Sequence, residues 1–285
     1  MHGGQVCSSK PLLCLSIAKV IESMSRKTIT KVCHRRDNYG TCIETVDVEI
    51  WEGISGYFFR AKMAVDVDGG PHAYHPEDYY PNNIAKSYDY LDNLSLSDRH
   101  GIQGETGVGP ANGFIVSGTS ASDDRFPSND TRHWVNAEII PYIVLTGKFP
   151  NAEGFPLIAK GDAALVADLK TGFWSPAVFA DYGRAVGESS LALAWNMGLD
   201  PTKSKRPPKV TGYDEQRFVY LAFPNANVDP PWPLPAIHDK VAEQFRVWGD
   251  GTGFVDCFRN FQVRNKQSQL DHLYSILKVV KRSLI

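Results

Sequence analysis

Short apolar runs recur through the middle of the chain, and clusters of Gly, Pro, Asn and Asp separate them. Runs of this length and spacing are typical of β-strands. Many are continuously apolar, which fits strands of a closed barrel or strands covered on both faces. We therefore predict a mainly β (α+β) fold with a closed β-barrel core and a few peripheral helices. The runs span residues 46–51, 56–67, 113–120, 137–145, 162–169, 176–181 and 218–224.

Three further segments have the apolar spacing of helices, at 83–95, 188–198 and 236–249. The domain organisation follows from these patterns. Residues 1–45 are predicted to be an N-terminal extension that is either disordered or helical, and residues 46–256 are predicted to form one domain. Residues 257–285 are expected to form a helical C-terminal tail.

Composition narrows the classes of protein that this chain can be. Its 285 residues are 42% hydrophobic and 22% charged, which is ordinary for a globular protein. The net charge of −2 argues against a nucleic-acid partner, and the absence of eighteen consecutive apolar residues argues against a membrane-spanning helix. An apolar patch near the N-terminus resembles a signal peptide, but Lys19 and Glu22 interrupt it and no small-residue cleavage site follows. An amphipathic helix or a disordered leader is the alternative.

Five cysteines lie at positions 7, 14, 33, 42 and 257, and no C-x-x-C motif occurs. A structural zinc site is therefore not expected. The odd count fits reduced thiols at least as well as a disulfide framework. Cys33 and Cys42 have the right separation to pair around the intervening loop, and the sequence leaves both states open.

One stretch, residues 178–198, carries two carboxylates seven residues apart. Asp181 closes an apolar strand, and Glu188 is predicted to lie in the first turn of the next helix. Gly183 and Gly187 allow the connecting backbone to turn sharply. Two carboxyl groups held apart can hydrolyse an acetal, because one protonates the leaving oxygen while the other activates a water or attacks the sugar. The plainer interpretation is that Glu188 caps a helix and Asp181 belongs to a turn.

Five blocks occur in one order along the chain, at 58–76, 113–124, 132–145, 160–166 and 177–199. Together they resemble glycoside hydrolase family 75, the fungal-type chitosanase family, in its bacterial-like branch. The resemblance covers roughly residues 50–250 and implies that residues 46–256 are the glycoside hydrolase domain. It also implies an endo-acting, inverting enzyme that cleaves β-1,4-linked glucosamine polymers, with Asp181 and Glu188 as the catalytic pair.

Secretion is expected from the family, although the chain has no clear signal peptide. The sequence departs from the family pattern at two points. The loop between the two acids is shorter than in the fungal chitosanases, and Arg184 stands where a proline is expected. The turn and the run after it also resemble double-psi β-barrels, found in family 45 cellulases and some lytic transglycosylases. That analogy indicates a double-psi-like barrel with six strands.

Glu188 is assigned as general acid and Asp181 as general base. A helix N-terminus would lower the pKa of Glu188 and oppose this assignment, and burial or the nearby Asp181 would raise it again. The roles would be exchanged if Asp181 proved the more buried of the two. The alternatives are a peptidoglycan lytic transglycosylase, which can work with one acid, and a non-catalytic carbohydrate-binding module.

Further residues are predicted to bind the substrate. A cationic chitosan-like polymer would be attracted to carboxylates, and Asp66 is the first choice for a contact, with Asp68 beside it. Lys62 lies on the same run and can hold a neighbouring carboxylate ionised. Thr119 and Ser120 are predicted to hydrogen-bond sugar hydroxyls, with a plain turn as the alternative.

The segment after residue 65 contains candidate metal ligands. Asp66, Asp68, His72 and His75 could supply ligands, but their spacing matches no complete calcium loop and no helical zinc motif. No metal and no cofactor is therefore expected. The expected partner is a polysaccharide substrate.

Overall fold

The structure is a computed structural model, and it describes residues 26–51, 54–80, 87–94, 113–202 and 210–246. Its strands are β1 (Arg26–Arg36), β2 (Cys42–Trp51), β3 (Ile54–Asp66), β4 (Tyr142–Thr146), β5 (Asp162–Asp168), β6 (Trp174–Gly183), β7 (Glu188–Ser190) and β8 (Tyr213–Asn227). Its α-helices are α3 (Leu191–Asn196) and α4 (Leu234–Arg246), and its 3-10 helices are η2 (Leu91–Asn93) and η4 (Thr131–His133).

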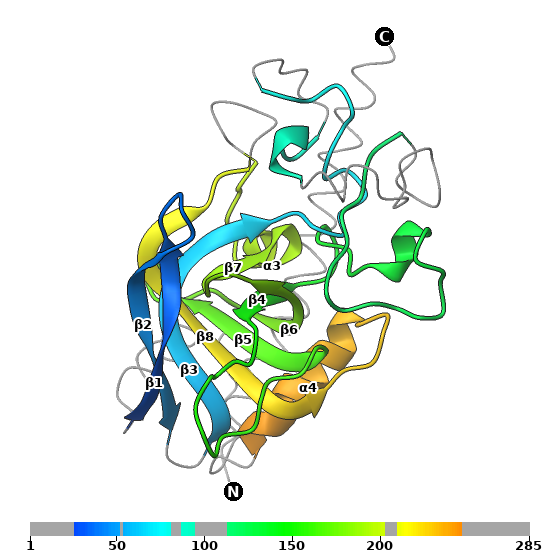
Figure 1. Cartoon of the computed structure of the whole chain (residues 1–285). Coiled ribbons are helices and arrows are strands. Elements are labelled where there is room, and N and C mark those ends of the chain that lie inside the picture. Colours follow the sequence, from blue (N-terminus) through cyan, green and yellow to red (C-terminus); the bar gives the residue numbers. More distant parts are fainter. Residues whose placement is uncertain (1–25, 52–53, 81–86, 95–112, 203–209, 247–285) are drawn as a thin grey trace, which may run out of the picture.

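Six strands close into a barrel in the order β3-β7-β4-β6-β5-β8, because β8 pairs back onto β3 (Figure 1). The pairs β3–β7 and β4–β6 are parallel, whereas the other barrel pairs are antiparallel. The predicted closed β-barrel core is therefore confirmed, and the number of its strands is the one that the barrel analogy indicated.

Both faces of the barrel strands are buried, which explains why their sequences are continuously apolar. In β5 every residue is buried. Leu165 belongs to a core cluster that includes Ile237 and Val241 of α4. Its neighbour Val166 points to the opposite face and belongs to a second cluster, which includes Leu193 of α3. The predicted helix at 236–249 is confirmed as α4 over the part that the structure describes.

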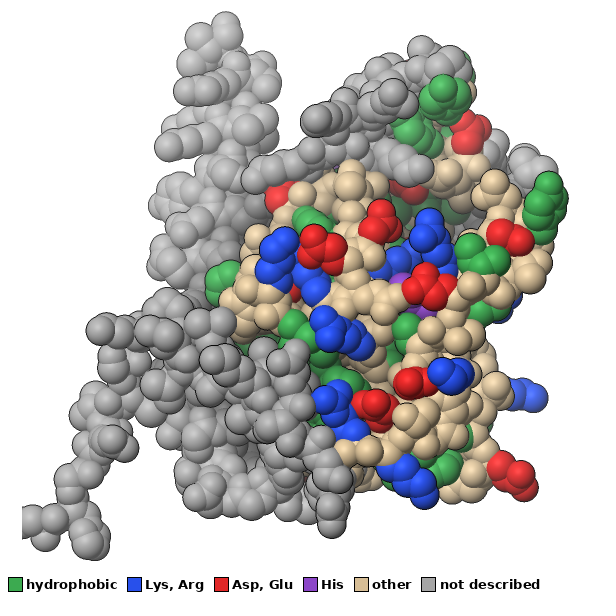
Figure 2. Space-filling view, turned by 90° about the vertical axis from the view of Figure 1, so that its left-hand side faces the viewer, with side chains coloured by type: hydrophobic (Ala, Val, Ile, Leu, Met, Phe, Trp, Pro, Cys, Tyr) green, Lys and Arg blue, Asp and Glu red, His purple; other side chains and the backbone are tan. Residues whose placement is uncertain are grey.

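Residues 26–45 differ from the predicted extension, because they form β1 and the start of β2. These two strands make an antiparallel hairpin, and β2 continues the sheet by pairing with β3. Figure 2 shows the face on which the hairpin lies, where basic and acidic side chains are interspersed. Cys33 and Cys42 form a disulfide near its turn, so the structure takes one of the two states that the sequence left open.

Three predicted elements are wrong or shorter than expected. Residues 87–94 contain only the short η2 rather than part of an α-helix, and residues 113–120 contain a single β-bridge rather than a strand. The strand predicted at 137–145 begins only at residue 142. The predicted leader and the tail at 257–285 lie outside the described residues. Within the described part, none of the helices has the length and apolar character needed to cross a membrane.

Candidate active site

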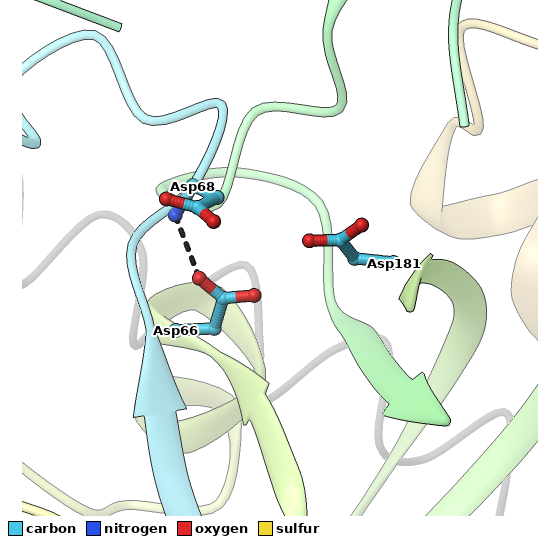
Figure 3. Close-up of side chains that lie close together, drawn as sticks. All are labelled: Asp66, Asp68 and Asp181. Carbon is cyan, nitrogen blue, oxygen red and sulfur yellow. Dashed lines mark hydrogen bonds between the residues drawn. The ribbon is translucent and has the colours of Figure 1, made fainter. Parts of the chain in front are cut away.

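The first carboxyl groups of the site lie at the end of β3 and in the turn after it. Asp66 is the last residue of β3 and is only 9% exposed. The backbone N–H of Asp68 donates to Asp66 Oδ1 at 2.9 Å (Figure 3). Gly69 follows with a φ of +75°, and a Cβ at this position would lie 2.0 Å from the Val135 carbonyl oxygen. Only glycine fits this turn, which places Asp68 beside Asp66.

Asp68 is oriented by three hydroxyl groups. Its Oδ1 accepts hydrogen bonds from the Tyr74 hydroxyl, at 3.1 Å, and from the Ser117 hydroxyl. The Tyr142 hydroxyl donates to the Asp68 carbonyl oxygen at 3.0 Å. Tyr74, Ser117 and Tyr142 are all buried, so this arrangement is rigid. No sequence motif marked Ser117, because a lone serine in an apolar run looks like any buried strand residue.

Asp181 lies near the end of β6 and is held through one of its oxygens. Asp181 Oδ1 accepts the backbone N–H groups of Ser120 and Tyr182, each at 2.8 Å, and also the Ser120 hydroxyl. Among the described residues, Oδ2 has no hydrogen-bond donor. The carboxylate is therefore fixed in orientation while one oxygen stays available to another molecule.

Asp66, Asp68 and Asp181 converge, although they come from two different strands and a turn. Each contributes a carboxylate oxygen within 4.8 Å of the other two, and Figure 3 shows Asp181 facing the pair at the end of β3. Oxygen atoms grouped in this way are of the type that divalent cations bind, but acidic groups often gather without an ion. The group thus forms one acidic site built from residues far apart in sequence.

Glu188 joins the same site from β7. Val144 of β4 pairs with Asp181 on one side and with Glu188 on the other, so the two acids lie on strands that flank a single strand. Two strand spacings put their backbones about 9.6 Å apart. Gly183 lies beside both Val144 and Glu188, because a Cβ at this position would clash with Val144 Cγ1 at 2.7 Å and would lie in ordinary contact, at 3.5 Å, with Glu188 Oε2.

The predicted place of Glu188 in a helix is wrong, because residues 188–190 form β7. The helix α3 begins only at Leu191, and Ser190 caps it by accepting the Leu193 N–H. The pKa of Glu188 is raised from 4.5 to about 7, first by burial and then by the charges of Asp68 and Asp181. The expected lowering by a helix N-terminus does not apply at this position.

We call Asp66, Asp68, Asp181 and Glu188 the carboxylate cluster. Burial raises the pKa of Asp66 well above its ordinary range, and the charges of Asp68, Glu188 and Asp181 raise it further. The pKa of the buried Tyr142 is raised by burial and then by all four members of the cluster. Because burial and like charges nearby disfavour ionisation, Glu188 keeps its proton up to a pH of about 7.

Lys62 and Thr119, two other residues predicted to bind substrate, have different surroundings. Lys62 lies close enough to Glu188 for its charge to lower the pKa of that carboxyl, but burial and the neighbouring acids outweigh it. Thr119 is buried, and its hydroxyl donates to Ala121 O at 2.7 Å and accepts from Val135 N at 3.0 Å. Its hydroxyl is thus occupied by the backbone, which fits a structural role rather than the predicted sugar contact.

Of the four metal ligands considered from the sequence, Asp66 and Asp68 lie together in the acidic group, whereas His72 and His75 have other partners. His72 is exposed and pairs with Glu138, with 3.0 Å between Nδ1 and Oε2. The His75 ring packs edge-on against Phe114. Within the described residues, neither histidine shares an acidic group with Asp66 and Asp68 of the kind that Asp181 completes.

The β1–β2 hairpin supports the loop that joins the two acids. The Val186 N–H donates to Cys33 O at 2.8 Å, and Arg36 Nε donates to the Arg184 carbonyl at 2.6 Å. Beneath the loop, the buried His34 accepts the Lys62 N–H at Nε2, so its ring proton lies on Nδ1. Arg184, which replaces the expected proline, thereby contributes its carbonyl to this support.

Comparison with known protein families and curated proteins assigns no function, so the function is inferred from the geometry of the site. No model of a known protein family matches this chain, and no curated protein matches it.

Proposed function

We propose that this protein is an endo-acting glycoside hydrolase that cleaves β-1,4 linkages in a chitosan-like glucosamine polymer. The observation that carries this proposal is the contrast between two neighbouring carboxyl groups. Glu188 has a pKa of about 7 and no hydrogen-bond donor among the described residues, so it can hold a proton to give away. Asp181 has one oxygen fixed by three donors and the other open. Paired carboxyl groups in contrasting environments are typical of an acid and a base.

In the proposed reaction, Glu188 donates its proton to the glycosidic oxygen as the bond from that oxygen to the anomeric carbon breaks. A water attacks the anomeric carbon from the opposite side, and its proton passes to Asp181 Oδ2. The product has inverted configuration, and exchange with solvent returns both carboxyl groups to their starting states. The strand between the two acids supports inversion, because retaining enzymes hold their carboxyl groups only about 5–5.5 Å apart.

The acidic composition of the cluster supports a cationic substrate. Asp66 and Asp68 lie beside the proposed base, and an ammonium group of the polymer that approached Asp66 would favour the ionised form of that carboxyl and pair with it. The resemblance of the residue blocks to family 75 chitosanases points to the same polymer.

The test is incubation with chitosans of defined acetylation, followed by mass and anomeric analysis of the products. We expect wild-type protein to release short oligomers of inverted configuration. The variants Asp181→Asn and Glu188→Gln should each lose at least 100-fold in rate while staying folded. Asp47→Asn, on the exposed side of the hairpin, is the matched control and should retain full activity.

Other outcomes would replace this proposal. Products with anhydro-sugar ends from peptidoglycan would identify a lytic transglycosylase, which needs only the acid. Binding to chitosan without any release of reducing ends would identify a carbohydrate-binding module. Full activity in both carboxyl variants would refute the assignment of the catalytic pair.

A further inference from the structure

The segment at residues 119–121 runs beside the end of β6 and is joined to it by hydrogen bonds. The Ala121 N–H donates to Ala180 O at 2.8 Å. One residue earlier, Ser120 donates both its backbone N–H, at 2.8 Å, and its hydroxyl to Asp181 Oδ1. The contact joins residues that are 61 positions apart in the sequence.

The hydroxyl of Ser120 is held in one direction. It accepts the Tyr182 N–H at 3.1 Å, so its own proton is directed away from that donor and toward Asp181. A hydroxyl that is both acceptor and donor in this way cannot turn freely toward a ligand. Ser120 therefore interacts with the carboxylate and is poorly placed for the sugar contact that the sequence indicated.

Ser120 is itself held on both sides. Lys160 Nζ donates to the Ser120 carbonyl at 2.6 Å. The hydroxyl of the preceding Thr119 is bound to the backbone at residues 121 and 135. The serine is thus a fixed support for Asp181 rather than part of a mobile turn.

We propose that Ser120 is a positioning residue for Asp181, with Lys160 acting on it through the Ser120 carbonyl. By fixing Oδ1 with its hydroxyl and its backbone N–H, Ser120 aims Oδ2 at the attacking water. This inference rests on the proposed function of Asp181 as a general base. It gives Ser120 a different role from substrate binding.

Kinetics separate the two roles of Ser120. Ser120→Ala keeps both backbone donors to Asp181, so the fold should persist. If Ser120 positions the base, kcat falls about 10–100-fold with KM nearly unchanged, as for the loss of one hydrogen bond to a charged group. Ser120→Thr keeps a hydroxyl and should recover most of this loss. Ser122→Ala is the matched control, because the Ser122 hydroxyl donates to Asp124 at 3.0 Å and not to Asp181.

A second measurement does not depend on activity. The backbone amide of Tyr182 donates both to Asp181 and to the Ser120 hydroxyl, so its nitrogen chemical shift reports this arrangement. In Ser120→Ala this shift should change, in Ser120→Thr it should return toward the wild-type position, and Ser122→Ala should leave it in place. Lys160→Met, which leaves every donor to Asp181 intact, should lower kcat by less, about 2–5-fold.

The outcomes distinguish this inference from the proposed function. If the wild-type protein hydrolyses no polysaccharide, the proposed function fails, and the Tyr182 amide shift still tests whether Ser120 holds the Asp181 carboxylate. If the wild type is active but Ser120→Ala leaves kcat unchanged, the inference is overturned. A rise in KM alone would also overturn it and restore the sugar contact.

Discussion

Replacing Glu188 by glutamine is expected to stabilise the protein in alkaline solution. The pKa of this carboxyl is raised from 4.5 to about 7 in the folded chain, first by burial and then by Asp68 and Asp181. Between these two values the folded protein keeps a proton that the unfolded chain has already released. The free energy of unfolding of the wild type therefore falls as pH rises through this window, and levels off above it.

The size of the effect follows from the same shift. Each pKa unit corresponds to about 1.4 kcal/mol, so the wild type loses roughly 3 kcal/mol at this group between pH 4 and pH 8. Glutamine has no proton to lose at either pH. The stability difference between Glu188→Gln and wild type should therefore widen by roughly 3 kcal/mol over that range.

Urea denaturation followed by tryptophan fluorescence, at pH 4, 6 and 8, measures this difference directly. Glu153→Gln, a change at an exposed residue, is the control and should give a difference that does not depend on pH. A stability difference for Glu188→Gln that stays constant from pH 4 to pH 8 would refute the argument that burial and neighbouring charges keep this carboxyl protonated.

Further changes in pH or in sequence also have definite expected outcomes. In the proposed reaction Glu188 acts in its protonated form, so kcat/KM should fall about tenfold per pH unit above pH 7. Asp68→Asn removes a charge that raises the pKa of Glu188, so the fall in its pH–rate profile should begin at lower pH, and an unmoved profile would count against the cluster. Replacing Cys33 and Cys42 by serine opens a link across 9 residues and should cost roughly 3 kcal/mol in urea denaturation. Gly187→Ala should lower stability by about 2 kcal/mol or more in thermal unfolding, because φ is +92° and the new Cβ would lie 2.9 Å from two atoms of β3; an unchanged Tm would contradict this geometry.

The barrel strands could be predicted from sequence because each one has a continuous apolar pattern within its own residues. Strands covered on both faces need apolar residues at successive positions, and residues 163–167 of β5 show this directly. Residues 46–51 of β2 were predicted as a strand, but β1 and the start of β2 escaped prediction because they are only partly covered and polar residues alternate along them. At residue 188 the helical spacing of the following leucines concealed a three-residue strand. That strand exists only through its pairing with β3 and β4, which no local pattern reveals.

In the candidate site, too, some residues could be predicted from the sequence and others could not. Asp181 and Glu188 could be selected from sequence, because the turn between them and the resemblance marked both. The role of Ser120 could not, since its contact with Asp181 depends on the path of a loop that contains no regular strand. The rise in the pKa of Glu188 could be anticipated from burial and from Asp181, but the contribution of Asp68 could not, because Asp68 comes from the other side of β7.

The position of β4 between β6 and β7 has a consequence for variation in this protein. The separation of the two acids is determined by the width of one inserted strand, and the length of the connection from residue 184 to 187 does not enter into it. Insertions or deletions in that connection can therefore accumulate without changing the distance between the backbones of Asp181 and Glu188. The proposed reaction is thus compatible with the short connection in this chain, whereas a bulge or deletion within β4 would change the distance on which it depends.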